Sequence, residues 1–114
     1  MSFQRADTAR VAVPVVILSG QTVISGSATA NGLLEGFTVV APAITGTLTV
    51  AIADQDGTPL FSLAAIPQGN TFVYKDVNNQ PLRIPIAGNH TVTITSSAAQ
   101  AANAPLTVNL LITK

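Results

Sequence analysis

Hydrophobic residues alternate with threonines and small residues in several short runs of this chain. The clearest run lies within residues 45–65, where Leu48, Val50 and Ile52 are separated by threonine or alanine. Successive side chains of a strand point to opposite faces, so one face of this run is apolar. The run stops at residues 54–57 (Asp-Gln-Asp-Gly), where a glycine can take the positive φ of a tight turn, and a second apolar run leads back. We predict a β-hairpin here, around which the rest of the chain is organised.

Similar runs recur about 8–12 residues apart, with turn residues between nearly all of them. The first, Val11 to Leu18, contains Pro14, which cannot donate to a ladder, so we expect this strand at a sheet edge or with a bulge. Further strands are predicted at 21–27, 37–41, 71–75, 82–86, 90–96 and 106–113, and loops at 28–36 and 97–105.

No segment carries the 3.6-residue apolar stripe of a helix. The predicted fold class is therefore all-β, an antiparallel β-sandwich; a jelly roll of about eight strands is favoured and an immunoglobulin-like sandwich stays open. Strict alternation selects eight side chains for the core: Leu48, Val50, Ile52, Val92, Ile94, Val108, Leu110 and Ile112.

The 114 residues suffice for one domain, which we place at residues 11–114, after an N-terminal arm at residues 1–10. The arm has no hydrophobic period and carries the residues that we predict as a protein interface: Phe3, Arg5, Asp7 and Arg10. On a partner, Phe3 can bury its ring while the arginines reach carboxylates or carbonyls. Alternatively, Arg5 and Asp7 pair locally and contribute little. The apolar stretch after the arm imitates a signal peptide, but Asp7 and Pro14 oppose that interpretation, and we expect mature protein.

Charged residues make up only 9% of the chain, against about 25% in an ordinary soluble domain. A surface so poor in charge predicts that another chain covers part of it, and we expect a homo-oligomer. The net charge of zero argues against a nucleic-acid partner, and no apolar run approaches the ~20 residues that span a membrane. The absence of cysteine excludes disulfides and thiolate metal sites.

No residue pattern indicates catalysis, a metal or a cofactor, so we predict that the chain is not an enzyme. Residues 54–57 resemble the start of a calcium loop but lack its third ligand position and its closing glutamate. His90, the one histidine, is expected to be a solvated turn residue. Phe72 and Tyr74 share one strand face, which predicts core packing; a sugar-stacking platform is the alternative.

The last third, PLRIPIAGNHTVTITSSAAQAANAPLTVNLLITK, resembles the closing strands of small head or tail proteins of double-stranded DNA bacteriophages. In size, low charge, lack of cysteine and β content, the whole chain is similar to the jelly-roll cement, or decoration, proteins of tailed-phage capsids. This resemblance implies a non-enzymatic virion protein, made in the host cytoplasm, that sits as a homo-dimer or homo-trimer on the outer surface of the capsid. There it bridges neighbouring subunits of the major capsid protein.

Two other functions compete with this one. A receptor- or carbohydrate-binding β-sandwich of a phage fibre, spike or adhesin predicts exposed aromatic or acidic clusters on loops, whereas the loops here are short. A jelly-roll hydrolase or isomerase needs several histidine and glutamate ligands, and the chain has one of each.

Overall fold

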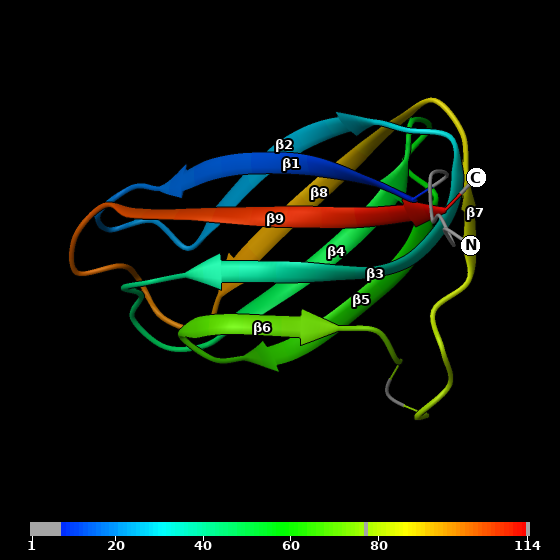
Figure 1. Ribbon diagram of the computed structural model, residues 1–114. Coiled ribbons are helices and arrows are strands. Elements are labelled where there is room, and N and C mark those ends of the chain that lie inside the picture. Colours follow the sequence, from blue (N-terminus) through cyan, green and yellow to red (C-terminus); the bar gives the residue numbers. More distant parts are fainter. Residues whose placement is uncertain (1–7, 77, 114) are drawn as a thin grey trace.

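The computed structural model describes residues 8–76 and 78–113 (Figure 1). Within these ranges the chain forms strands and connecting turns, and no helix that could cross a membrane occurs there. Nine strands build two antiparallel sheets that pack against each other, so the predicted all-β sandwich is confirmed.

The first sheet has five strands and contains both ends of the described chain. Its order is β1 (Thr8–Ile17), β9 (Ala104–Thr113), β3 (Gly32–Ala41) and β6 (Gly69–Val73), and the short β7 (Ile84–Ile86) also pairs with β3. The second sheet has four strands, in the order β2 (Val23–Thr29), β8 (Asn89–Ser96), β4 (Leu48–Asp54) and β5 (Pro59–Ile66).

The strand pairs are nested along the chain like the two arms of one long hairpin. β4 pairs with β5 at the tip, β3 with β6, β2 with β8, and β1 with β9 at the open end. Successive pairs fall alternately into the two sheets, and the pairs β9–β3 and β8–β4 complete each sheet. This is the topology of a jelly roll, with β7 as a short addition. The hairpin predicted at residues 45–65 is the tip of the whole arrangement.

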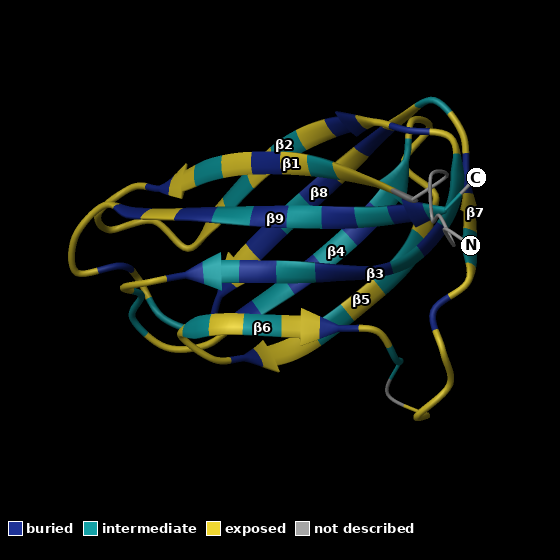
Figure 2. Cartoon of the chain, in the orientation of Figure 1, coloured by how far each residue is buried: buried dark blue, intermediate teal, exposed yellow. Residues whose placement is uncertain are grey.

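The core lies between the two sheets, as the dark residues of Figure 2 show. All eight side chains that the alternation selects are at most 1% exposed, so this prediction is confirmed. Phe37 lies among them and meets Phe61 edge to face, with ring centroids 5.7 Å apart. Apolar burial of this extent is the main favourable term for folding.

Most strand boundaries differ from the prediction by one or two residues, and two of them differ by three or more. β1 begins at Thr8, so residues 8–10 of the predicted arm are paired with β9; residues 1–7 lie outside the described part. β3 begins at Gly32, inside the predicted loop 28–36, and pairs there with β7 and β9. Pro14 does lie in a strand at a sheet edge, as expected, because β1 has a neighbour on one side only.

Candidate functional site

One broad face of the sandwich consists of side chains that point away from the core on β1, β9, β3 and β6. We call it the outer face. The registers of these strands align its side chains in rows that run across the sheet. One row is Ala12, Asn109, Thr38 and Phe72, and the next is Pro14, Thr107, Val40 and Asn70. Neither row contains a charged residue.

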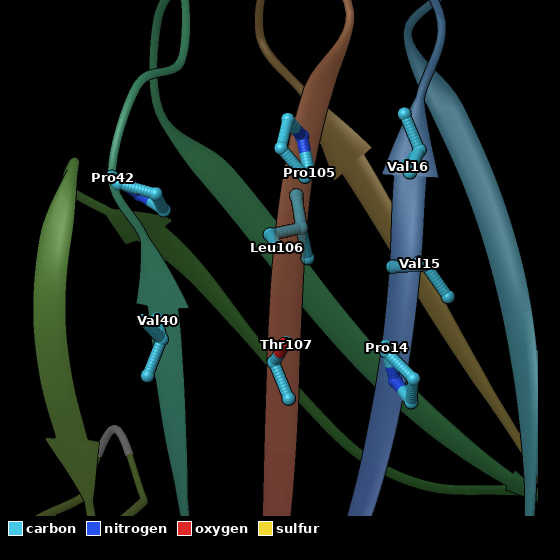
Figure 3. A pocket seen from close by; sticks show the side chains of 8 residues that line it. All are labelled: Pro14, Val15, Val16, Val40, Pro42, Pro105, Leu106 and Thr107. Carbon is cyan, nitrogen blue, oxygen red and sulfur yellow. The ribbon is translucent and has the colours of Figure 1, made fainter.

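A hollow of about 350 Å³ opens on this face near the end of β1 and β3 (Figure 3). It is lined by side chains from β1, from β9 and from the end of β3: Pro14, Val15, Val16, Val40, Pro42, Pro105, Leu106 and Thr107. The hydroxyl of Thr107 is the only side-chain polar group in this set. The hollow therefore suits an apolar side chain and has nothing that would hold an ion or orient a polar substrate.

Two aromatic rings project from the outer face at its β6 edge. The side chains of Phe72 and Tyr74 are 54% and 50% exposed, and their rings stack with centroids 5.2 Å apart. Lys75 extends its ammonium group to 5.5 Å from the centre of the Tyr74 ring. The expectation that this pair packs in the core is wrong, because Val73, between the two rings, is the residue that points inward.

Gly36 leaves room for one edge of the Phe72 ring against the sheet. A Cβ atom at Gly36 would stand 3.2 Å from Cε1 of Phe72 and 2.9 Å from the carbonyl oxygen of Val73. Only a residue without a side chain leaves this space free, and an aromatic ring covering a glycine on a neighbouring strand is a recurring way to stabilise such a site.

Of the four interface residues predicted from the sequence, the structure describes Arg10 alone. Its side chain is exposed on β1, at the position paired with Leu111, and therefore belongs to the outer face. Phe3, Arg5 and Asp7 lie outside the described residues, and their predicted role stays a prediction.

The acidic residues at the tip of the β4–β5 hairpin serve the turn. Asp54 Oδ1 accepts a hydrogen bond from the backbone N–H of Gln55 at 2.7 Å, and Asp56 Oδ1 accepts one from the backbone N–H of Thr58 at 3.2 Å. The Thr58 hydroxyl, followed by its amide, lowers the pKa of Asp56 below the usual value of 3.8. Within the described ranges, no three histidine or carboxylate side chains gather where a metal ion could bind.

His90 is buried, and the expectation of a solvated turn residue is wrong. Its side chain is 2% exposed because it has the same strand parity as Val92 and Ile94 and so points into the core. Nε2 lies 3.9 Å from Oδ1 of Asp54, too far for a hydrogen bond, and Nδ1 has no partner among the described residues. Among residues 8–76 and 78–113, no serine hydroxyl hydrogen-bonds to Nδ1 of this ring.

No family model matches the chain, and no curated protein matches it either. Among solved structures, it is similar to FlgD from Xanthomonas campestris, which is described by its part in the hook capping essential for flagellar assembly. The two share 22% identity over 85% of this chain and 69% of that one, with a TM-score of 0.40. A likeness this remote transfers neither architecture nor function.

The comparisons nevertheless correct the function expected from the sequence. No family model and no curated protein carries the resemblance to decoration proteins, and the solved structure named above is a flagellar hook-capping protein. Decoration of a phage capsid is therefore withdrawn as the function of this chain. The alternative of a receptor- or carbohydrate-binding domain receives no support from them either.

The sequence drew attention to Phe72 and Tyr74 but assigned them to the wrong side of their strand. It also missed the hollow, although a signal was present. Prolines stand within the first strand, directly after the third and near the start of the last, at positions 14, 42 and 105. Proline at a strand end or edge leaves a gap in the ladder and a non-polar surface, and three such positions meet on one sheet face.

Proposed function

We propose that this chain is a non-enzymatic structural protein that joins a protein assembly by docking the outer face of its five-stranded sheet onto another protein surface. The observation that carries the proposal is the stacked pair Phe72 and Tyr74, two rings that are each about half exposed on a face with an apolar hollow. Large aromatic side chains dominate the binding energy of protein interfaces, and their exposure on a lone subunit is unfavourable.

The low charge of the chain supports the same function. An ordinary monomer covers itself with charged side chains, whereas here they are 9% of the residues, and the two central rows of the outer face have none. The centre of a stable protein interface shows the same depletion of charge and enrichment in aromatic residues. A polar substrate or a nucleic acid would find no ionic partner in these two rows.

The test compares two exposed apolar side chains on opposite sheets. Phe72→Ser removes a ring of the outer face, and Val23→Ser removes a side chain of similar exposure, 49% against 54%, from β2 in the other sheet. Both variants should stay folded, since neither side chain is in the core; Val23→Ser should keep the melting temperature of the wild type, and Phe72→Ser should lower it slightly because the ring no longer covers Gly36. In a native extract of the cells that make the protein, wild type and Val23→Ser should migrate well above the monomer mass of 11.6 kDa, and Phe72→Ser should move toward it.

Two outcomes would contradict the proposal. One is a wild-type chain that migrates as a monomer in the native extract. The other is a Phe72→Ser variant that stays in a complex of unchanged size, because docking would then use a different surface.

A further inference from the structure

We propose that the surface that docks onto the outer face is the outer face of a second copy of this chain, related to the first by a twofold axis parallel to the strands. This inference rests on the proposed function and names its partner. Such an axis lays β6 of each copy over β1 of the other and β3 over β9. Each row of side chains then faces the same row of the other copy, read in the opposite direction.

The rows of the face are complementary to themselves under this rotation. In one row, Phe72 at the β6 end comes to lie opposite Ala12 at the β1 end of the other copy. The row thus carries its largest side chain at one edge and its smallest at the other, and both are exposed. A projecting ring therefore meets a small residue twice, once on each side of the axis. Hot-spot aromatic side chains bind in this manner, in a recess of the opposite surface.

The neighbouring features fit the same arrangement. Tyr74, stacked on Phe72, comes to the level of Arg10 of the other copy. A guanidinium group beside a tyrosine ring is an attractive pair.

Charge also favours a second copy over a different protein. The net charge of the chain is zero, so two copies approach without long-range repulsion. A charge-free surface gains most from a partner surface that is equally free of charge, because no ionic group is then left buried and unpaired. The two rows that contain Ala12 and Pro14 form such a surface at the centre of the outer face.

The available area predicts a dimer of modest affinity. Four strands spaced about 4.8 Å apart and about eight residues long, at about 3.4 Å per residue, cover roughly 500 Å² on each copy. Both copies together bury about 1,000 Å², the lower limit of a specific interface. We therefore expect dissociation in the micromolar range, where the projecting rings decide whether the pair forms.

Cross-linking of introduced cysteines tests the geometry, because the chain has no cysteine of its own. Pro14 and Asn70 lie at opposite ends of one row and are both exposed, so the rotation brings residue 14 of one copy over residue 70 of the other. Purified Pro14→Cys and Asn70→Cys chains are mixed and treated with a short bismaleimide. Linked dimers should form in the mixture and several-fold less in either variant alone. Ser27→Cys, on the opposite sheet, should link to neither.

Sedimentation of the purified chain supplies the second measurement. Wild type and Val23→Ser should form a concentration-dependent dimer, and Phe72→Ser should weaken it about tenfold or more. Dominant links of residue 14 to 14 or of 70 to 70 would overturn the proposed axis. A purified chain that stays monomeric while the native extract shows a large complex would overturn the second copy as partner and leave the proposed function in place. Monomers in both experiments would end both proposals.

Discussion

At the scale of single residues, His90 is a buried side chain with a polar atom that is unpaired within the described ranges. Its imidazole is 2% exposed, and Nδ1 has no hydrogen-bond partner among the described residues. An unsatisfied polar group in the interior costs about 1–3 kcal/mol. We expect His90→Leu to keep or raise the free energy of unfolding in urea, by about 1 kcal/mol, and His90→Asn to lower it because the smaller amide leaves a cavity and unpaired atoms. A clear loss of stability in His90→Leu would show that the ring has a partner, such as a buried water molecule.

Gly26 controls how closely β2 approaches β1. A Cβ atom there would lie 2.6 Å from Cγ1 of Val13 and 3.0 Å from Cγ1 of Val15. Valine rotates poorly about χ1, so these methyl groups cannot move aside freely. We expect Gly26→Ala to lower the free energy of unfolding by about 1–3 kcal/mol. Ser27→Ala, on the exposed side of the same strand, should change it by less than about 0.5 kcal/mol. Equal stability of the two variants would mean that the sheets separate without strain.

Asp56 has a residue-scale property that a titration can measure. The Thr58 hydroxyl, then the Thr58 amide, lowers the pKa of this carboxyl below 3.8. A lowered folded-state pKa stabilises the turn above the unfolded-state value, and this contribution is lost as the pH falls through the folded-state value. Thr58→Val removes the hydroxyl and should raise the pKa of Asp56 toward its ordinary value, as followed by carboxyl NMR shifts. An unchanged pKa would place the cause elsewhere.

At the scale of elements, the hairpin β4–β5 is the most local pair of the fold. It closes through a short turn in which Gly57 has φ +89°, whereas every other nested pair joins strands far apart in the chain. The entropy of loop closure grows with loop length, so we expect this hairpin to form first in folding. Gly20, in the turn after β1, has a similar φ of +83°, and added Cβ atoms at both glycines would meet nothing within 4 Å.

Alanine at either glycine therefore imposes the same backbone strain. The two turns, however, are expected to form at different stages of folding. We expect Gly57→Ala and Gly20→Ala each to cost about 1–2 kcal/mol. Gly57→Ala should slow folding, and Gly20→Ala should instead speed unfolding, as measured by stopped-flow in urea. If Gly20→Ala slows folding as much as Gly57→Ala does, the β4–β5 hairpin does not form first.

The elements with unbroken alternation were predictable from the sequence, and the others were not, for identifiable reasons. In β3 the register shifts between Leu34 and Gly36, so Leu34 and Phe37 both point inward although they are three residues apart. This bulge breaks the two-residue period, and the first half of the strand resembles a loop. In β6 the period is intact, but it does not say which of its two faces is buried, and the glycine that receives Phe72 is on another strand.

The fold was predictable because it depends on local alternation, whereas the candidate site depends on how distant strands are aligned. The core depends on period and hydropathy, which each run carries locally. The outer face depends on the alignment of rows from four strands and on three prolines that are distant in sequence. Those alignments result from the nesting of the strand pairs, which no single run specifies.

At the scale of the whole molecule, strand pairing can begin either at the innermost pair, β4–β5, or at the outermost pair, β1–β9. Thr8 is the register partner of Thr113, so the ends of the described chain are neighbours in the sheet. Joining the two ends by a short linker and opening the chain between Asp56 and Gly57 keeps every strand in place. The permuted chain, however, has β1 and β9 as its local hairpin and β4 and β5 as its most distant pair.

We expect this permutant to reach the same fold with its folding order reversed. Val13 of β1 and Val50 of β4 are both buried, at 2% and 0% exposed, and alanine at either should cost about 2 kcal/mol. In the parent chain, Val50→Ala should slow folding and Val13→Ala should mainly speed unfolding. In the permutant, the two effects should exchange, because the rate-limiting step follows the most local pair. Stopped-flow folding of the parent, the permutant and the two alanine variants of each measures this exchange. If both substitutions act in the permutant as in the parent, the order of folding follows from the chemistry of the strands and not from their nesting.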